Sequence, residues 1–312
     1  MPDGRRIDTP RPVCLPDGVS EEREEMDGTR PQVLRYAAFT RDPAGGNPAG
    51  VVPDAAGLRE EEMLSIAAEV GYSETAFLTA PPDGPGRSFT VRYFAPETEV
   101  PFCGHATVAA AVALAERIGP GPLEFATRSG PVPVEVEQEA DGTLRATLTS
   151  VEPYVEQVPD QDVSQALAAL HWRPDELDPA LPPRIAFAGA RHLVLAAATR
   201  ARLAALDYDF DALRAFMTAR DLTTLHLVWR ESKHVFHVRD PFPVGGVRED
   251  PATGSAAAAF GAYLRELGLV DATATVTLHQ GQDMGRPALL RVDLHEGDRR
   301  VRVSGTAVRI PR

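Results

Sequence analysis

The chain contains 312 residues, which corresponds to about two domains of ordinary size. Hydrophobic residues make up 43% of it but aromatic residues only 6%, so we expect cores built mainly from aliphatic and small side chains. The formal net charge of −13 argues against nucleic acids and anionic membranes as partners. It does not exclude a small anionic substrate, because a helix N-terminus can bind a carboxylate locally.

The N-terminal residues 1–32 are rich in Pro, Glu, Asp and Arg and lack an apolar stretch, so we expect a flexible tail and no secretory signal. No apolar run in the chain reaches the roughly 18 residues that a membrane span needs. The two cysteines, Cys14 and Cys103, do not make a disulfide framework, and a reducing cytoplasm is the expected location.

The first half of the chain predicts a series of strands and helices. A strand pair is followed by an amphipathic helix, a turn and the start of a strand within 59–80, and then by a strand in SFTVRYFAP (88–96). A glycine step leads into a helix of small residues, CGHATVAAAVALAERIG (103–119). Further strands, beginning with PVPVEVEQ (131–138), close this half.

The second half repeats the same order of elements. The helical segment 209–230 lies over 59–80, and TGSAAAAFGAYLRELG (253–268) lies over the first small-residue helix. Three pairs of residues share an offset of 150: Gly104 with Gly254, His105 with Ser255, and Glu74 with Thr224. Agreement at several anchors indicates an internal duplication.

The duplication predicts an α+β fold with two similar lobes. The small-residue helices should be central, because small side chains let strands approach a helix on all sides. The expected parts are a tail (1–32), an N-terminal lobe (33–150), a connection (151–180) and a C-terminal lobe (181–312). A duplicated scaffold tends to build one site between its halves, from unlike residues at like positions.

Two polar residues of the first half are candidates for that site. The segment GYSETAF places Glu74 between a glycine turn and a strand, either as a surface carboxylate or as a general base among apolar neighbours. The segment PFCGHATVAA places His105 behind a glycine at an expected helix start. It is either an ordinary helix-start residue or a proton carrier whose charged form the helix dipole disfavours.

The second half contributes EDPATGSA, in which Asp250 precedes Thr253 by three residues. The simplest interpretation is a helix cap, with Thr253 or Ser255 as N-cap and Asp250 favoured by the dipole. That interpretation leaves Gly254 unexplained, because glycine costs helix stability. Glycine is useful where backbone N–H groups must approach a ligand, so Gly104 and Gly254 are predicted to form twin anion sites at facing helix N-termini.

The remaining motifs give weaker evidence of a functional site. His234 and His237 do not form a ligand pair on one strand face, and no Cys/His cluster has zinc spacing, so we expect no metal. The segment AGGNPAGV (44–51) lacks the Lys-Ser/Thr of a phosphate loop. We expect a tight loop there, with Asn47 reaching the cleft.

Five motifs together resemble the PhzF-like family of phenazine-biosynthesis isomerases: GNPAGV, SETAF, VRYFAPETEVPFCGHAT, EDPATGSA and QGxxMGRP (280–287). The resemblance covers nearly all of the chain from about residue 33 onward. It implies the diaminopimelate-epimerase-like fold, in which each lobe is a central helix wrapped by a mostly antiparallel sheet or barrel. It also implies a cofactor-free enzyme, typically a homodimer, with its active site in the cleft between the lobes.

By the same resemblance, the catalytic residues are Glu74, His105 and Asp250. The expected substrate-binding residues are Asn47, Ser73, Gly104, Gly254 and Ser255. Epimerases of this fold use two facing cysteines, and Cys103 stands at the first position, but its partner at the offset of 150 is Thr253. A threonine hydroxyl cannot act as a thiolate base, so two-thiol racemisation is disfavoured and Cys103 is interpreted as a small buried residue.

The resulting hypothesis is a carbon-to-carbon proton transfer. Glu74 takes an acidic C–H proton from a small carboxylic acid, such as a dihydro-hydroxyanthranilate or another secondary-metabolite intermediate, and returns it elsewhere on the conjugated system. His105 and Asp250 orient the substrate or relay the proton. The alternatives are an epimerase or lyase on the same scaffold, and a binding protein without turnover.

Overall fold

The computed structural model describes residues 31–79 and 86–311 of the chain. Residues 1–30 of the predicted tail lie outside this range. In the first half the structure forms two helices and eight strands within the described residues. They are β1 (Leu34–Ala38), β2 (Asn47–Val52), α1 (Glu60–Val70), β3 (Glu74–Thr79), β4 (Ser88–Phe94), β5 (Glu99–Val100), α2 (Gly104–Ile118), β6 (Gly121–Thr127), β7 (Gly130–Gln138) and β8 (Leu144–Thr149).

The second half contains the larger number of helices. Its elements are β9 (Tyr154–Gln157), α3 (Asp160–Ala169), η1 (Pro174–Glu176), β10 (Arg184–Phe187), β11 (Arg191–Ala196), α4 (Arg200–Ala204), α5 (Phe210–Ala219), β12 (Thr224–Arg230), β13 (Val235–Pro241), η2 (Pro243–Gly245), β14 (Glu249–Asp250), α6 (Gly254–Glu266), β15 (Ala274–Gln280), η3 (Gln282–Met284), β16 (Ala288–His295) and β17 (Asp298–Arg309).

The two halves pair their strands in the same pattern. In the first, β2 runs parallel to β3, β3 antiparallel to β4, β4 parallel to β6, and β6, β7 and β8 are successively antiparallel. In the second, β11, β12, β13, β15, β16 and β17 follow the identical sequence of parallel and antiparallel pairings. The predicted duplication and the two-lobed α+β fold are therefore confirmed.

The last strand of the chain connects the two lobes. Strand β17 pairs antiparallel with β16 of its own half, and also with β8 and β1 of the first half. It thereby closes β1, β2, β3, β4, β6, β7 and β8 into an eight-stranded barrel around α2. In return, β9 leaves the first half and pairs with β10 of the second. The limits of the lobes at residues 150 and 181 stay a prediction, and each half ends in the sheet of the other.

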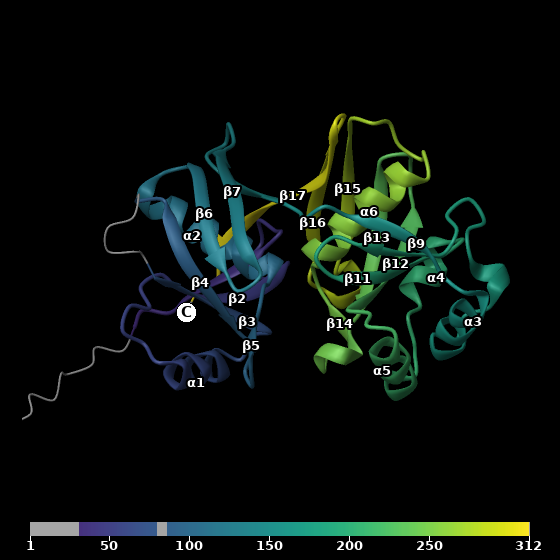
Figure 1. Ribbon diagram of the computed structural model, residues 1–312, viewed down its shortest axis with the longest axis horizontal. Helices are drawn as coiled ribbons and strands as arrows, with labels where there is room; N and C mark the ends of the chain where they lie inside the picture. The colour runs from purple at the N-terminus through teal and green to yellow at the C-terminus, as the bar shows by residue number, and fades with distance from the viewer. Residues whose placement is uncertain (1–30, 80–85, 312) are drawn as a thin grey trace, which may run out of the picture. The chain divides into compact units, whose positions relative to one another are not determined.

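The central helices are built from small residues because strands surround them (Figure 1). Helix α2 buries every residue from His105 to Ala115, and α6 buries every residue from Ala256 to Leu264. A Cβ atom on Gly261 of α6 would lie 2.7 Å from Cγ1 of Val292 on β16, closer than side-chain atoms pack. Small side chains thus set how closely the strands approach, as the composition indicates.

The outer helices cover the sheets on the side away from α2 and α6. Helix α1 packs through Met63, Ile66 and Ala67 on Phe77 of β3 and Phe94 of β4. Helices α3 and α5 pack on each other in a second apolar cluster that includes residues of β11 and β12. Among the described helices, none combines the length and the apolar character that crossing a membrane requires.

Candidate active site

The N-termini of the two central helices meet. Helix α2 begins at Gly104 and α6 at Gly254, and a Cβ atom added to Gly104 would lie 3.8 Å from the Cα atom of Gly254. The N-cap residues, Cys103 and Thr253, provide no side-chain cap to either helix. The free N–H groups and positive dipole ends of both helices therefore converge on one place, which favours a bound anion.

The fold itself does not require glycine at these two positions. Neither residue has a positive φ, and a Cβ atom at either would meet only ordinary contacts of 3.7–4.0 Å. The close approach of a ligand to the backbone, which the sequence predicts for Gly104 and Gly254, stays a prediction.

Glu74 reaches the helix ends from the start of β3. Helix α1 ends at Gly71 in the left-handed conformation (φ 71°), and the chain then turns through Ser73 into β3, which runs parallel to β2. The Oε2 atom of Glu74 lies 3.3 Å from Nε2 of His105, and the hydroxyl oxygen of Ser73 lies at the same distance from that nitrogen. Three of the predicted residues are thus brought together.

His105 is buried at the first turn of α2. Burial lowers its pKa below the ordinary range, against the opposing effect of the Glu74 carboxylate and of a hydrogen bond that a ring N–H donates to the Pro48 carbonyl. The imidazole is therefore neutral at physiological pH. A neutral imidazole can both accept and donate a hydrogen bond.

Cys103 belongs to the same cluster, which sequence reasoning missed. It is buried, as predicted, but its thiol donates to Oε2 of Glu74 over 3.4 Å and lies 3.4 Å from Nδ1 of His105. Burial and the Glu74 carboxylate raise the pKa of the thiol well above its usual value, so the sulfur stays protonated. The sequence signal that could have placed Cys103 in this cluster was its position at the helix start, two residues before His105.

Asp250 approaches from the second lobe, on β14. Its carboxylate accepts from Nδ2 of Asn47 at 2.7 Å and from the hydroxyl of Thr253 at 2.6 Å. Asn47 also donates to the Ala252 carbonyl at 3.1 Å, so one amide ties the first lobe to the segment that carries Asp250. Thr253 occupies the N-cap position of α6, as predicted, but its hydroxyl donates to Asp250 and makes no capping hydrogen bond to the helix.

Asp250 has the most perturbed carboxyl group at this site. Burial raises its pKa from 3.8 to about 7, and the negative charges of Glu74 and Asp240 add to the effect. Asp240 lies directly opposite Asp250 in the antiparallel pair of β13 and β14. The hydrogen bonds from Thr253 and Asn47 act in the opposite direction. Asp250 therefore changes its protonation state near neutral pH, as a proton-transfer residue must.

Gln280, at the end of β15, holds the segment around Asp250. Its amide nitrogen donates to the Asp250 backbone carbonyl at 2.8 Å, and its amide oxygen accepts from the Thr253 N–H at 3.0 Å. Nearby, the Arg286 guanidinium donates to the carbonyl oxygens of Gly45 and Gly46, which lie in the other lobe. The motif QGxxMGRP thus orients the site and joins the lobes, roles that the motif alone did not indicate.

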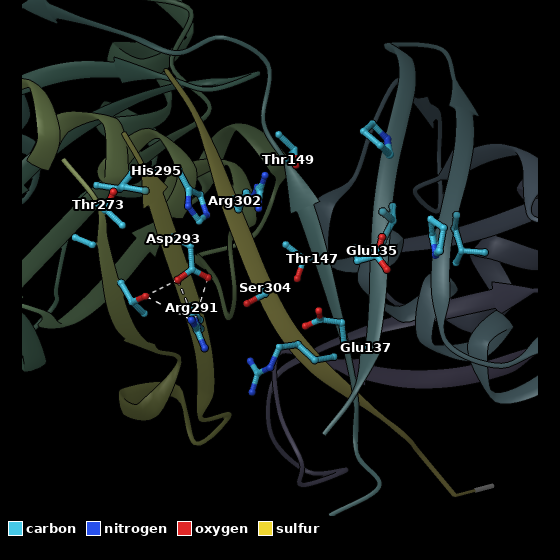
Figure 2. A pocket seen from close by; sticks show the side chains of 18 residues that line it. Glu135, Glu137, Thr147, Thr149, Thr273, Arg291, Asp293, His295, Arg302 and Ser304 are labelled. Carbon is cyan, nitrogen blue, oxygen red and sulfur yellow. Dashed lines mark hydrogen bonds and ion pairs between the residues drawn. The ribbon is translucent and has the colours of Figure 1, made fainter. Parts of the chain in front are cut away.

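A cavity of about 710 Å³ lies elsewhere and is lined by side chains of β6–β8 and β15–β17 and by Thr273 (Figure 2). Its walls are mostly polar, with an ion pair between Arg291 and Asp293, and none of the predicted site residues lines it. We therefore assign the candidate active site to the helix ends, where the perturbed groups converge.

Comparison with known proteins gives the family. Residues 36–311 match the model of a protein family whose description is "phenazine biosynthesis-like protein". The Escherichia coli K12 protein named uncharacterized isomerase YddE is 34% identical over 89% of this chain and 96% of its own length. The trans-2,3-dihydro-3-hydroxyanthranilate isomerase of Pseudomonas fluorescens is 30% identical, covering 87% and 94%.

The solved structures agree with this assignment. The phenazine biosynthesis protein of the PhzF family from Bacillus anthracis superposes with a TM-score of 0.80 at 25% identity, over 90% of this chain and 98% of that one. The family match spans both lobes and includes every segment that contributes to the candidate active site. The chain therefore belongs to the phenazine biosynthesis-like family of isomerases.

Proposed function

We propose that this isomerase moves a proton between two carbon atoms of a small conjugated carboxylic acid held between the ends of α2 and α6. The observation that carries the proposal is the convergence of Glu74, His105 and Asp250, from three separate segments, on two uncapped helix N-termini. A proton transfer of this kind needs a base, an acid and stabilisation of the intermediate charge. The three groups and the helix ends can provide all of these.

The helix ends would bind the substrate carboxylate or the developing enolate. Each N-terminus contributes on the order of 0.3–1 kcal/mol to binding an exposed anion, and up to about 2 kcal/mol when partly buried. Losing one preorganised donor to a developing oxyanion costs on the order of 3 kcal/mol. Asn47, Ser73, Gly104, Gly254 and Ser255 are the proposed binding residues.

Glu74 is the proposed base. Its carboxylate removes a proton from an acidic C–H bond, and the electron pair of that bond passes into the conjugated system. The same carboxyl group then protonates a second carbon, so that atoms and charge balance without any added reagent. Protonated Asp250 donates a hydrogen bond to the intermediate, and the ring of neutral His105 lies 3.3 Å from the Glu74 carboxylate. Such acid–base catalysis contributes about 10²–10⁴-fold.

The name of one relative guides the choice of substrate to assay. The Pseudomonas fluorescens relative is named for trans-2,3-dihydro-3-hydroxyanthranilate, which makes a cyclic, conjugated amino acid of this kind the first substrate to assay. Thr253, at the position opposite Cys103, hydrogen-bonds Asp250, so no observation favours a two-thiol epimerase. The homodimer that the resemblance implies stays a prediction, which light scattering on the purified protein would test.

The test replaces Glu74 with Gln and follows turnover of that substrate in D₂O. We expect Glu74→Gln to lose about 10²-fold or more in kcat, because the amide cannot accept the proton. Glu61→Gln, at an exposed position on α1, is the matched control and should keep the wild-type rate. Wild-type kcat in Glu74→Gln would overturn the assignment of the base, whether or not solvent deuterium enters the product.

A further inference from the structure

The same cluster of side chains contains three potential metal ligands. Glu74, Cys103 and His105 each offer one ligand atom, and these atoms all lie within 4.8 Å of one another. A thiol, an imidazole and a carboxylate are the three side-chain types that bind Zn²⁺ in proteins. The proton transfer proposed above uses the carboxylate and the imidazole but gives the thiol no role.

The spacing of the three atoms matches the edges of a tetrahedral metal site. Ordinary Zn–S, Zn–N and Zn–O bond lengths at tetrahedral angles place sulfur and oxygen about 3.5 Å apart, sulfur and nitrogen about 3.6 Å, and nitrogen and oxygen about 3.3 Å. The corresponding distances here are 3.4 Å from Sγ of Cys103 to Oε2 of Glu74, 3.9 Å from Sγ to Nε2 of His105, and 3.3 Å from Nε2 to Oε2. An ion would need only small side-chain movements to bind.

The surroundings suit a metal ligand set. A ring N–H of His105 donates to the Pro48 carbonyl, the kind of outer contact that orients a metal-binding imidazole. Cys103 is the N-cap residue of the buried helix α2, His105 stands on its first turn, and Glu74 stands at the start of β3, so regular structure positions all three. The Glu74 side chain keeps 17% of its surface exposed, which leaves a path from solvent.

We propose that Glu74, Cys103 and His105 form a site for a thiophilic divalent cation such as Zn²⁺ or Cd²⁺, with the fourth position open to water or a substrate carboxylate. Binding replaces the thiol proton, which is released to solvent, so the Cys103 sulfur binds as a thiolate. Hard cations such as Mg²⁺ and Ca²⁺ prefer oxygen ligands and are excluded by the sulfur and nitrogen donors.

Occupation of this site would stop turnover. A carboxylate oxygen that is bound to the metal cannot accept a C–H proton, and the imidazole is fixed at the same time. This consequence rests on the proposed function, whereas cation binding itself does not. The site would therefore make the enzyme sensitive to free zinc, with chelation restoring activity.

The direct test is titration of the purified full-length chain with Zn²⁺ by calorimetry, and with Co²⁺ followed by absorption. We expect one equivalent of each metal to bind, and the cobalt form to show a thiolate-to-cobalt charge-transfer band. Cys103→Ser should lose that band and bind Zn²⁺ at least about tenfold more weakly. Cys14→Ser, which removes the only other cysteine, is the matched control and should behave as wild type.

A second variant allows the proposal to be tested even if Cys103→Ser does not fold. Glu74→Gln keeps the size of the side chain but replaces a good ligand with a poor one, so it should also weaken Zn²⁺ binding while retaining the cobalt–thiolate band. Circular dichroism checks that both variants fold. The proposal is overturned if the wild type binds no stoichiometric Zn²⁺, if Mg²⁺ competes equally, or if Cys103→Ser binds as wild type does. An active enzyme that binds no zinc would refute this site and leave the proton-transfer proposal standing.

Discussion

The pKa of Asp250 leads to a test that needs no substrate. A carboxyl group whose pKa is about 7 in the folded protein and 3.8 in the unfolded chain binds its proton more tightly when folded. Its contribution to stability is fully present below about pH 4 and is lost as the pH rises through about 7. The stability of the wild type therefore carries a penalty that grows over this range, and Asp250→Asn, which does not titrate, lacks it.

The size of the effect follows from the shift. Each pKa unit corresponds to about 1.4 kcal/mol, so a shift of roughly three units amounts to about 4 kcal/mol over the whole range. Between about pH 5 and pH 8, where both states can be studied, the expected part is about 2–3 kcal/mol. The substitution also changes hydrogen bonds to Asn47 and Thr253, but that change is the same at both pH values and cancels in the difference.

The assay is urea unfolding of the wild type and of Asp250→Asn at both pH values. We expect the free energy of unfolding of the variant, minus that of the wild type, to be about 2–3 kcal/mol larger at pH 8 than at pH 5. Asp211→Asn, on the exposed side of α5, controls for the loss of one surface carboxyl. Parallel behaviour of Asp250→Asn and the wild type, within about 1 kcal/mol, would refute a buried, neutral Asp250.

Three further perturbations test the surroundings of the site. Asp240→Asn removes a negative charge that faces Asp250 across the β13–β14 pair, so the pKa of Asp250 in a ¹³C NMR titration should fall below about 7. Asn47→Ala removes a donor that favours the Asp250 carboxylate, so the same titration should show a higher pKa for Asp250. The substitution also leaves Asp250 Oδ1 and the Ala252 carbonyl without the Asn47 donor, which should lower the free energy of unfolding in urea by about 1–3 kcal/mol. Gly261→Val brings α6 into contact with β16 at 2.7 Å and should lower stability by about 1–3 kcal/mol, whereas Ala258→Ser on the same helix should cost less if overpacking is the cause.

Much of the architecture could be predicted from the sequence because it depends on local patterns. The small-residue helices begin at Gly104 and Gly254, where the glycine steps predict them, and β3 begins at Glu74 as SETAF indicates. The offset of 150 exposed the duplication because equivalent residues keep equivalent places in two copies of one fold. Even the facing of the two helix ends followed from this symmetry together with the glycines.

Other features depended on contacts between residues far apart in the chain. Periodicity cannot show that β17 closes the barrel of the first half, because strand pairing is decided by which edge is left unpaired after the other strands have formed. Likewise, the spacing of Cys103 and His105 gave no metal motif, because the third donor, Glu74, is 29 residues away from the sulfur along the chain.

The chemistry of Asp250 shows the same division most clearly. The sequence alone determined which residues are present at the start of α6, and it pointed to Asp250 as more than a cap. Only the tertiary structure decided that Thr253 would bind this carboxylate, that Asn47 would reach it from the other lobe, and that Asp240 would stand opposite. A pKa depends on burial and on charges within a few ångströms, and these are set by how distant segments pack.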